Sequence, residues 1–537
     1  MAVEVIDTGA LKKAESRILG AIPNSWLKTT LGDCFRWGSG GTPKSGNTEY
    51  YGGGIPWLVI GDLNDGIITK SGQTISELGL KNSSAKLVDE GTLLLAMYGS
   101  IGKLGVAGMK LATNQAIAFA EKNEIETKYI FNFLRYVRPH LNELGKGATQ
   151  QNISQTVIKA FPFPLAPLNE QKRIVAKIEE LFSELDNGIA ALKTAREQLK
   201  VYRQAVLKHA FEGELTVRWR KENSDKLESP EQLLARIHQE RETRYQQQLK
   251  EWKAVVKEWE ANDKEGKKPG KPKEFIKQGE LGAGSELSFE IPDSWTPMLM
   301  GHVFSVHVGA TPSRKKNDFW NGDVFWVSSG EVAFCEIHKT SEMITTMGYE
   351  NTSTEIHPEG TVLLAMIGEG KTRGQAAILR VPAAHNQNTA AIRVSEVNLS
   401  PEYIYYYLQY QYEQTRRVGS GNNQKALNKH RVSSIQFPLC SIQEQIAVVD
   451  AISEKLSFVE NLDVELDVQI AKSETLRHSI LKKAFSGQLI PQDPSDEPAT
   501  ELLARIVAEK AAMKNAVKPK SAGKTRSKQN QTTKGAT

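Results

Sequence analysis

The sequence predicts an α+β fold in which two sheet-rich globular domains are joined by two long antiparallel coiled-coil helices, arranged as a pseudo-twofold internal repeat. Three observations predict this fold. Strings of residues return at an offset near 270, short apolar runs alternate with polar, glycine-rich clusters, and an apolar heptad stripe follows each of these regions. A chain of 537 residues is also long enough for three or four folded units.

The composition is that of an ordinary globular chain, with 39% hydrophobic and 24% charged residues, which excludes collagen-like and wholly disordered chains. No apolar run approaches the roughly 18 residues of a membrane span, and the first twenty residues lack the apolar core of a secretory signal. We therefore expect a cytoplasmic protein. Cys34, Cys335 and Cys440 lie too far apart for zinc-ligand spacing, and we expect them to be small core residues.

The repeat consists of strings that return in the same order along the chain. Ile22–Trp26 returns as Ile291–Trp295, and Gly91–Met97 returns as Gly360–Met366, both at an offset of 269. Two copies of a unit of roughly 220 residues therefore cover nearly the whole chain. The other matches are Asn114-Gln115 with Asn386-Gln387, Phe163–Leu165 with Phe437–Leu439, Glu170-Gln171 with Glu444-Gln445, Ala210–Gly213 with Ala484–Gly487, and Leu233–Ile237 with Leu502–Ile506.

The two parts of each copy differ in hydrophobic period. Short apolar runs such as Trp57–Ile60 and Leu93–Met97 stand between clusters of Gly, Asn, Ser and Thr, which predicts strands joined by loops. From Leu168 the period changes to seven, which predicts a helix of about 39 residues and about 58 Å. The stripe is Ile178, Leu185, Leu192, Leu199 and Val206 in the first copy, and Ile452, Val459, Leu466 and Ile480, interrupted by Ser473, in the second.

The long helices have two possible partners. Each stripe could pack only on its own globular domain, but a domain of this size measures roughly 30 to 35 Å, so the helix is longer than the domain. We therefore favour pairing of the two helices with each other. Trp252 and Trp259, seven residues apart, fit a short amphipathic helix between the copies, and the Lys/Gly/Pro segment after it fits an exposed linker.

The last residues form a separate basic segment. Residues 510–537 hold eight Lys or Arg and no acidic residue, and removing these eight charges from the net charge of +5 leaves −3 for residues 1–509. We favour a disordered tail over a specific DNA-binding arm. The expected boundaries are an N-terminal segment at 1–21, domain 1 at 22–167, long helix 1 at 168–212, a helical and charged linker at 213–285, domain 2 at 286–441, long helix 2 at 442–486, a C-terminal helical segment at 487–515 and a disordered basic tail at 516–537.

No catalytic pattern is complete. Gly368–Thr372 ends like a nucleoside-triphosphate loop, but Ala365 stands where the first glycine would fall, and the equivalent segment Gly99–Leu104 has no hydroxyl after its lysine to hold magnesium. Dinucleotide-type loops fail by one residue at Arg373 and at Pro43, and the histidines and cysteines lack metal-ligand spacing. We expect no catalytic residue, no metal and no cofactor in this chain.

Three loops recur that carry Lys or Arg, amides, hydroxyls and glycine. Lys and Arg neutralise DNA phosphates, whereas Arg, Asn and Gln can contact base edges. Each loop alone also fits a solvated turn, but the framework strings match while the loops differ, which predicts two readers of different halves of one bipartite, asymmetric DNA target. In the first copy the candidate DNA-binding residues are Thr42, Lys44 and Ser45 in the first loop, Tyr98, Ser100 and Lys103 in the second, and Lys146, Gln150, Gln151 and Asn152 in the third. In the second copy they are Thr311, Arg314, Lys315 and Lys316 in the first loop, Lys371, Thr372 and Arg373 in the second, and Asn422, Asn423, Gln424 and Lys425 in the third.

These motifs together resemble the specificity subunit of type I restriction-modification systems, over roughly residues 20–515. The motifs are Ile-Pro-x-Ser-Trp at the start of each globular domain, Gly-Thr-Pro or Ala-Thr-Pro in the first loop, and Gly-Thr-[Leu/Val]-Leu-Leu-Ala-Met in a central strand. Phe-Pro-Leu with Glu-Gln at the start of each long helix and Ala-Phe-x-Gly-x-Leu at its end complete the set. Their order, occurring twice, makes the resemblance specific.

The resemblance implies a non-catalytic, DNA-binding chain with two target-recognition domains, in which the paired helices set the spacing between them. It implies assembly with double-stranded DNA, with two methyltransferase (modification) subunits and with two restriction (translocase/nuclease) subunits. S-adenosylmethionine, ATP and magnesium would be bound by these partners, and the helices and the tails after Ala-Phe-x-Gly would dock the modification subunits. The charged linker at 240–285 departs from the family pattern.

Two other interpretations of the residues stay open. A self-sufficient DNA methyltransferase or nuclease would need a cofactor loop that this sequence lacks. A coiled-coil scaffold without DNA affinity would bind no duplex at any salt concentration, whereas the affinity of a DNA reader falls steeply as salt rises.

Overall fold

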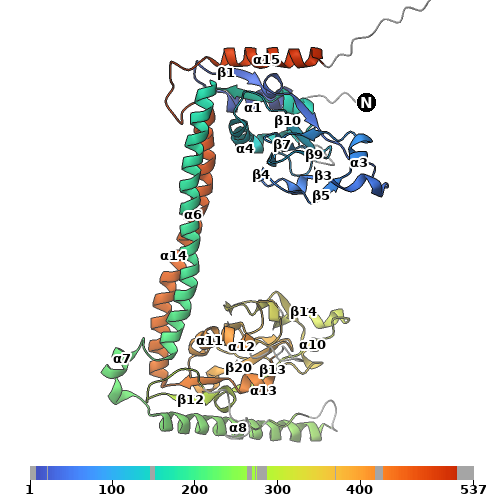
Figure 1. Ribbon diagram of the computed structural model, residues 1–537. Coiled ribbons are helices and arrows are strands. Elements are labelled where there is room, and N and C mark those ends of the chain that lie inside the picture. Colours follow the sequence, from blue (N-terminus) through green and yellow to red (C-terminus); the bar gives the residue numbers. More distant parts are fainter. Residues whose placement is uncertain are drawn as a thin grey trace, which may run out of the picture. The chain divides into compact units, whose positions relative to one another are not determined.

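The computed structural model describes residues 8–20, 22–145, 152–262, 269–272, 274, 287–368, 370–417 and 427–516. The chain divides into two compact units: unit 1 comprises Met1–Leu192 and Val468–Thr537, and unit 2 comprises Lys193–Asp467. Each unit contains one sheet-rich domain and part of each long helix (Figure 1). Among the described helices, none has the length and apolar character that a membrane span requires.

Domain 1, in unit 1, is built on a five-stranded sheet of order β2-β10-β7-β8-β4 and a four-stranded sheet of order β5-β3-β9-β6, while β1 pairs with β11. The strands are β1 (Leu27–Thr30), β2 (Trp37–Ser39), β3 (Tyr51–Leu58), β4 (Ile67–Ile68), β5 (Gln73–Ile75), β6 (Leu87–Val88), β7 (Leu93–Ala96), β8 (Leu104–Ala107), β9 (Leu111–Thr113), β10 (Ile117–Ala120) and β11 (Pro162–Leu165). The helices are α1 (Thr8–Ile18), α2 (Leu31–Cys34), α3 (Glu77–Lys81), α4 (Thr127–Leu144) and α5 (Gln155–Ala160), with short 3-10 turns η1 (Thr48–Tyr50) and η2 (Ile60–Asp62).

Domain 2, in unit 2, repeats this topology with sheets of order β13-β20-β17-β18-β15 and β16-β14-β19 and with the pair β12-β21. In place of a strand equivalent to β6, it has a single bridge between His357 and Ala383. The strands are β12 (Thr296–Leu299), β13 (Ser305–Val308), β14 (Trp320–Val327), β15 (Cys335–Ile337), β16 (Glu342–Ile344), β17 (Val362–Ala365), β18 (Ala376–Leu379), β19 (Ala384–His385), β20 (Thr389–Arg393) and β21 (Gln436–Leu439). The helices are α9 (Met300–Val303), α10 (Thr346–Glu350), α11 (Pro401–Tyr410), α12 (Tyr412–Arg417) and α13 (Lys429–Ser433), with 3-10 turns η4 (Asn317–Phe319), η5 (Ser329–Glu331) and η6 (Val394–Val397).

The repeated Gly-Thr-[Leu/Val]-Leu-Leu-Ala-Met string is the central strand of each five-stranded sheet. Because successive side chains of a strand point to opposite faces, Leu93 and Leu95 of β7 enter one core while Leu94 and Ala96 enter another. The first core also contains Tyr129, Phe133 and Val137 of α4, so this helix covers one face of the sheet. In domain 2, β17 divides in the same way between two cores. The unbroken apolar run of the string therefore reflects a strand that is buried on both faces.

The two long helices are α6 (Leu168–Phe211) and α14 (Ile442–Phe485), with 44 residues each and lengths of about 66 Å at about 1.5 Å per residue. In unit 1, Arg477 of α14 is paired with Asp186 of α6. In unit 2, Arg196 Nε lies 2.9 Å from Asp463 Oδ1 and Arg203 lies 3.8 Å from Glu460, so residue numbers fall along α14 as they rise along α6. The predicted antiparallel pairing is confirmed, and each helix is longer than the roughly 39 residues expected from its heptad stripe.

The heptad stripes are buried toward the helix ends. The side chains of Ile178, Val206, Ile452, Val459 and Ile480 are buried, whereas Leu185, Leu192, Leu199 and Leu466 are partly exposed. Ile178 lies in the core of domain 1, and Ile452 lies in the core of domain 2. The stripes therefore serve both interactions considered from the sequence. They pack on a domain toward both ends of each helix, since Val206 lies in the core of domain 2 and Ile480 in the core of domain 1, and the ion pairs between α6 and α14 lie between these ends.

Each long helix ends in the domain of the other copy. Phe485, at the end of α14, packs edge-on against Tyr129 at 5.2 Å and Phe133 at 5.3 Å in domain 1. Phe211, at the end of α6, packs in the same way against Tyr403 at 5.2 Å and Tyr407 at 5.1 Å in domain 2. The phenylalanine of the Ala-Phe-x-Gly string is thus a core residue of the other copy's domain.

The glycine of the same string ends each helix and contacts the Ile-Pro-x-Ser-Trp string. Gly213 and Gly487 have φ values of +74° and +71°, the left-handed conformation that commonly follows a helix. A Cβ at Gly213 would lie 2.5 Å from Pro292 Cγ, and a Cβ at Gly487 would lie 2.3 Å from Pro23 Cγ. Backbone conformation and close packing therefore both require glycine, which explains why these two strings recur together.

The segments after the long helices also cross between copies. After α14, helix α15 (Ala499–Ala516) places Leu502 and Ile506 in the core of domain 1. After α6, the chain forms α7 (Val217–Glu222), η3 (Ser224–Lys226) and α8 (Pro230–Ala261), which runs beside domain 2 (Figure 1). Leu233 and Ile237 of α8 lie in the core of domain 2. The repeated Leu-Leu-Ala-Arg-Ile string is therefore the contact of each terminal helix with a domain.

Three expectations need correction or completion. Cys34 and Cys440 are buried, and burial raises the pKa of the Cys34 thiol to about 12, but Cys335 is only partly buried because it lies on the edge strand β15. Trp252 and Trp259 belong to the 32-residue helix α8 rather than to a short one, since polar residues extend it beyond the packed part. The basic tail predicted at 516–537 lies outside the described residues from 517 onward.

Candidate nucleic-acid interface

The first and second predicted loops leave the same end of the five-stranded sheet in each domain. In domain 1, β2, β10, β7 and β8 are successive antiparallel neighbours, with Ser39 opposite Ala118 and Ala96 opposite Ile117. The loop after β2, the β9–β10 loop and the β7–β8 loop therefore start at the same end of the sheet. The equivalent registers in domain 2 give the same arrangement. We call this end of each sheet the loop edge.

The first loop is held against the β9–β10 loop, or in domain 2 against the β19–β20 loop, by close backbone contact. A Cβ at Gly40 would lie 1.8 Å from the carbonyl oxygen of Thr113, and a Cβ at Gly309 would lie 1.9 Å from that of His385. The indole of a buried tryptophan then fixes the next residue: Trp57 donates to the Gly41 carbonyl at 3.0 Å, and its equivalent in β14 donates to the Ala310 carbonyl at 3.1 Å. The loop backbone is thus fixed in the same way in both domains.

The threonine of the first loop meets a glutamine of the neighbouring loop. Thr42 Oγ1 donates to Gln115 Oε1 in domain 1, and Thr311 Oγ1 donates to Gln387 Oε1 at 2.5 Å in domain 2. Both glutamines are exposed. The structure therefore joins two loops that lie about 70 residues apart in the sequence into one exposed polar surface.

The remaining residues of the first loop differ between the domains. Lys44 and Ser45 are exposed, and so are Lys315 and Lys316. Arg314 is also exposed, but its guanidinium is paired with Glu342 and lies 3.9 Å from the centroid of the Trp320 ring. The Arg314 hydrogen bonds outweigh the effect of burial and lower the pKa of the Glu342 carboxyl. In domain 2 the positive charge available at this loop therefore comes mainly from the two lysines.

The second loop of domain 1 connects β7 and β8. Tyr98 and Ser100 are exposed and Lys103 is partly buried. Gly99 and Gly102 turn the chain with φ values of +64° and +82°. Tyr98 forms an isolated antiparallel bridge with Asn152, so the second loop touches the end of the third. Lys146, Gln150 and Gln151 of the third loop lie outside the described residues, whereas Asn152 is described and exposed.

The second loop of domain 2, between β17 and β18, is tied to α12. The Tyr412 hydroxyl donates to the Lys371 carbonyl at 2.6 Å, Arg373 Nη2 donates to the Arg416 carbonyl at 3.0 Å, and Arg416 Nη1 donates to the Arg373 carbonyl at 3.2 Å. Lys371 is exposed, whereas Thr372 and Arg373 are partly buried. Asn422, Asn423, Gln424 and Lys425 of the third loop lie outside the described residues.

Different groups support the second loop in the two domains. In domain 1, Arg138 donates to Asp65 Oδ2 at 3.0 Å and to the Gly102 carbonyl at 2.8 Å. Burial disfavours the charged carboxylate of Asp65, but the hydrogen bonds from Arg138 and from the Leu104 amide outweigh it and lower the pKa of Asp65. In domain 2 the rings of Phe334 and Tyr412, 5.2 Å apart, take the place of this ion pair.

Two buried histidines lie beneath the loop edge of domain 2. Arg393 Nε donates to His357 Nδ1 at 3.0 Å, so a neutral His357 carries its proton on Nε2. This Nε2 lies 3.1 Å from Nε2 of His385, whose Nδ1 in turn lies 2.6 Å from the Thr389 hydroxyl. Burial lowers the pKa of both histidines, to about 2 for His357 and about 4 for His385, and it outweighs the Glu355 carboxylate and, at His385, the Asn386 carbonyl, which raise the pKa. The chain of hydrogen bonds is therefore satisfied by two neutral imidazoles.

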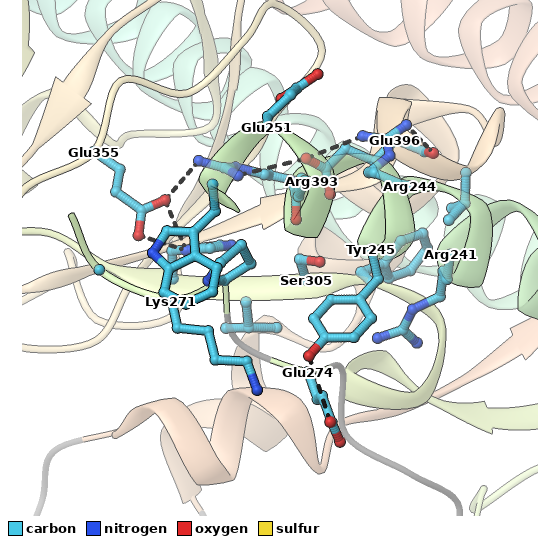
Figure 2. Close-up of a pocket in the computed structure, with 18 of the residues that line it drawn as sticks. Arg241, Arg244, Tyr245, Glu251, Lys271, Glu274, Ser305, Glu355, Arg393 and Glu396 are labelled. Carbon is cyan, nitrogen blue, oxygen red and sulfur yellow. Dashed lines mark hydrogen bonds and ion pairs between the residues drawn. The ribbon is translucent and has the colours of Figure 1, made fainter. Parts of the chain in front are cut away.

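A cavity of about 560 Å³ in unit 2 lies between α8 and domain 2. Figure 2 shows that several of its charged groups pair across it: Arg393 Nη2 donates to Glu355 at 2.8 Å, and Arg244 lies 3.1 Å from Glu396. A hydrogen bond with His307 outweighs burial and holds the pKa of Glu355 well below its ordinary value. We interpret these contacts as the attachment of α8 to domain 2.

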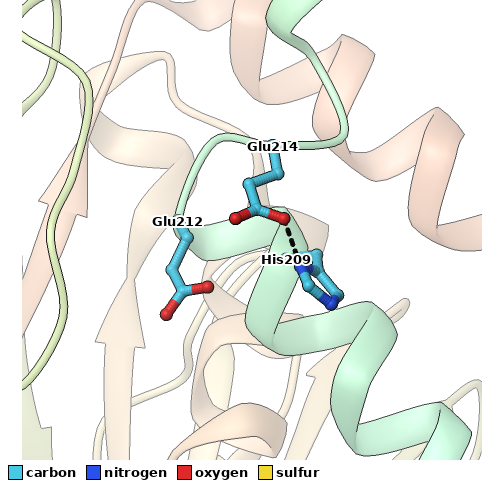
Figure 3. Close-up of side chains that lie close together, drawn as sticks. All are labelled: His209, Glu212 and Glu214. Atoms are coloured by element: carbon cyan, nitrogen blue, oxygen red, sulfur yellow. Dashed lines mark hydrogen bonds and ion pairs between the residues drawn. The ribbon is translucent and has the colours of Figure 1, made fainter.

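His209, Glu212 and Glu214 form a cluster at the end of α6, with ligand atoms within 4.8 Å of one another (Figure 3). His209 Nδ1 is hydrogen-bonded to Glu214, and Glu212 lies 3.6 Å from the Lys208 ammonium. The equivalent positions of the second copy, Lys483, Ser486 and Gln488, do not repeat the cluster. The pairs within the cluster account for its geometry, and we assign no metal ion to it.

Sequence reasoning missed several groups at the loop edge. Gln115 and Gln387 were visible only as part of a repeated Asn-Gln string, and Glu342 lies far from Arg314 in the sequence. One feature of the sequence could have identified them. The polar Asn-Gln string is repeated between two apolar strands, and core packing does not require polar residues there. A repeated polar pair between strands therefore indicates a shared surface.

The sequence matches a known protein family in two places. The family described as "Type I restriction modification DNA specificity domain" matches residues 23–194 and 292–466, which together make up more than half of the chain. The two matched regions contain most of domains 1 and 2 and the first parts of α6 and α14.

Individual relatives extend over nearly the whole chain. The EcoBI specificity subunit of a type I restriction enzyme from Escherichia coli is 23% identical over 92% of this chain and 94% of its own length. The MjaIX specificity subunit from Methanocaldococcus jannaschii is 20% identical over 88% of this chain and 95% of its own length. A solved chain described under "complex assembly and conformational transition of the type I R-M system" has a TM-score of 0.58 and 16% identity, covering 87% of this chain and 99% of that chain, and so shares the fold.

The duplicated domain and the full-length relatives agree with the architecture described above. This chain belongs to the type I restriction modification DNA specificity family, carries the domain of that family twice, and is a non-catalytic specificity subunit.

Proposed function

We propose that domain 1 (22–167) and domain 2 (286–441) are target-recognition domains that each read one half of a bipartite, asymmetric DNA sequence. Long helix 1 (168–212) and long helix 2 (442–486) join them and set the distance between the half-sites. Within the segments at 213–285 and 487–515, helices α8 and α15 would attach each long helix to a domain. Helix α1 (Thr8–Ile18) of the N-terminal segment completes the first domain, with Ala14 and Ile18 in its core.

One observation carries this proposal: the two domains share their framework contacts and differ at the loop edge. The glycine, tryptophan and threonine contacts of the first loop are the same in both domains. The charged residues beside them differ, with Lys44 in one domain and Lys315 and Lys316 in the other. If the loops served only to build the fold, they would not be expected to differ where the framework is kept.

We propose that the exposed loop-edge residues make the DNA contacts. Lys44, Lys315, Lys316 and Lys371 would neutralise phosphates, because their side chains are exposed and phosphate contacts by Lys and Arg supply most of the affinity. Arg373 would act mainly by holding its loop, since its guanidinium is hydrogen-bonded to the Arg416 carbonyl. Third-loop residues such as Asn152 would complete the surface.

The chain is a subunit of a complex that acts on DNA, as its family indicates. We propose assembly with two modification subunits, which bind S-adenosylmethionine and methylate the target, and with two restriction subunits, which use ATP and magnesium. The methylated base would then be flipped into the active site of the modification subunit rather than into this chain.

Methylation-sensitive sequencing of host DNA tests the proposal. DNA from cells with and without this gene and its partner genes is compared, and we expect a split methylated sequence that disappears when this gene is deleted. A methylation pattern that does not depend on this gene, or one without two separated halves, would contradict the proposed role.

A further inference from the structure

The two domains present the same exposed polar pair at equivalent positions of their loop edges. The pair is Thr42 with Gln115 in domain 1 and Thr311 with Gln387 in domain 2, and in each case the threonine hydroxyl donates to the glutamine carbonyl. We call it the Thr–Gln pair. It is the point at which the first loop of each domain meets the loop that leads into the strand paired with β7 or β17.

The backbone holds each Thr–Gln pair in a fixed place. The asparagine before the glutamine forms a tight turn with its own loop: Asn114 Oδ1 accepts from the Ala116 amide at 3.1 Å, and Asn386 Oδ1 accepts from the Asn388 amide at 3.0 Å. On the threonine side, the first loop is fixed by its glycine and by the tryptophan indole. The Thr–Gln pair is therefore preorganised, although both glutamines and Thr42 are exposed and Thr311 is partly exposed.

The Thr–Gln pair keeps hydrogen-bonding capacity. Because the glutamine carbonyl accepts from the threonine, the two N–H groups of each glutamine amide have no acceptor among the described residues. An exposed, preorganised amide beside lysines suits a nucleic-acid phosphate, which accepts hydrogen bonds from neutral side chains as well as from Lys and Arg.

A DNA contact can be made to a base or to the sugar-phosphate backbone. The Thr–Gln pair has the same residues in both domains, and this favours the backbone. Side chains that read bases must differ between the domains if the two halves of the target differ, because each base pair presents its own pattern of donors and acceptors. The sugar-phosphate backbone is the part of the duplex that both halves share. A contact that is the same in both readers therefore fits the backbone.

We propose that the Thr–Gln pair of each domain anchors one DNA phosphate and sets the position of that domain on the duplex without choosing bases. This inference rests on the proposed function and adds to it a division of labour. The Thr–Gln pair positions each domain, and the choice of bases is left to loop-edge residues that differ between the two domains.

The test measures binding of the full chain to duplexes that carry the methylated sequence or single base-pair changes in one half. Gln115→Ala and Gln387→Ala are compared with the wild type and with Gln198→Ala, a control at an exposed glutamine of α6. We expect each loop-edge variant to weaken binding to every duplex by about tenfold, as for the loss of one hydrogen bond to a charged group. The ratio of affinities between target and changed duplexes stays the same, and the control stays at wild-type affinity.

A neutral methylphosphonate at single positions of the duplex identifies the contact itself. We expect one linkage in each half at which the replacement weakens the wild type but has no further effect on the glutamine variant of that domain. Gln115→Glu, which puts a negative charge opposite the phosphate, is expected to bind more weakly than Gln115→Ala.

Two outcomes would contradict the proposal that the Thr–Gln pair binds a phosphate. One is a loss of discrimination at a single base pair in Gln115→Ala or Gln387→Ala, which would make the glutamine a base reader. The other is unchanged affinity in both variants. Failure of the proposed function looks different, because the wild-type chain itself would then not distinguish the methylated sequence from changed duplexes.

Discussion

Domains 1 and 2 have the same strand order and the same framework contacts but differ in the polar groups beneath the loop edge. Domain 1 supports its second loop with the Asp65–Arg138 ion pair, whereas domain 2 places the rings of Phe334 and Tyr412 there. Domain 2 also buries two histidines, whose equivalents in domain 1 are Val88 and Thr113. Contacts that build the fold and hold the first loop recur, whereas those that support the second loop have changed.

The comparison shows which contacts are the same in both copies of the repeat. The recurring contacts lie where a long helix of one copy enters the domain of the other, as with Phe485 and Phe211. A change on one side of such a contact affects a second segment far away in sequence, so both sides are retained. The loop edge contacts only its own domain among the described residues, and it can change without disturbing the helices.

The largest expected effect comes from the helix ends. Phe485→Ala should destabilise unit 1, and Phe211→Ala should destabilise unit 2, each by about 3 to 5 kcal/mol, because a buried ring is removed from an aromatic cluster. Proteolysis across a urea series, with fragments assigned by mass spectrometry, measures each unit separately. Equal destabilisation of both units by either variant would contradict the separate cores.

Lowering the pH should destabilise domain 2 before domain 1. His357 and His385 are neutral in the folded domain, whereas they are protonated in the unfolded chain below about pH 6.5. Their contribution to the stability of domain 2 is therefore present above that pH and is lost as the pH falls, by roughly 2 kcal/mol for each histidine at pH 5. Arg393, Glu355 and His307 face this pair and hold the imidazoles in place.

Domain 1 should respond only in stronger acid. The pKa of Asp65 is lowered in the folded domain, so its contribution is present above the ordinary pKa near 4 and is lost below it. Urea unfolding at pH 8, 6.5 and 5 should thus show weakening of unit 2 before unit 1. His357→Val with His385→Thr, which copies domain 1, should remove the change between pH 6.5 and 5, and an unaltered change would reject the histidine explanation.

A smaller loss of stability is expected when the glycines that end the long helices are replaced. Gly213→Ala and Gly487→Ala should each cost about 1 to 2 kcal/mol in their own unit, because the left-handed φ disfavours alanine and the new Cβ meets a proline ring. Gly188→Ala is the matched control. It lies within α6 with open space where a Cβ would stand, and alanine favours helix there by up to about 1 kcal/mol. Thermal unfolding should move in opposite directions for the two kinds of variant.

The smallest effect on stability, but a clear one on DNA binding, is expected at the basic loop of domain 2. Replacing Arg314, Lys315 and Lys316 by alanine should weaken binding and lower the salt slope by about 2, because Arg314 is already paired with Glu342. Arg314→Ala alone should change the slope little. An unchanged slope in the triple variant would remove this loop from the DNA interface.

Much of the architecture followed from the sequence, because repeats and heptads are local patterns. The strands, the long helices and their antiparallel pairing needed only the order of strings such as Gly91–Met97 and the spacing from Ile178 to Val206. The exchange of helix ends between copies did not follow, because a repeated string shows which residues are equivalent but not which partner each contacts.

The candidate site was predictable only in part. The loops were recognised from their composition, but the Thr–Gln pair, the Arg314–Glu342 pair and the buried histidines depend on residues brought together from distant strands. Arg314 illustrates the limit, since the sequence shows a cation and the structure adds the carboxylate that offsets it. Local sequence gives the chemistry of a side chain, and the fold decides which neighbours modify it.

The most direct test of two independent recognition domains replaces domain 1 and leaves domain 2 unchanged. Residues 22–165 are replaced by those of a related specificity subunit, and the methylated sequence is determined in cells that also contain the partner subunits. The account predicts that one half of the target changes while the other half and the spacing stay the same. A change in both halves would contradict two independent recognition domains.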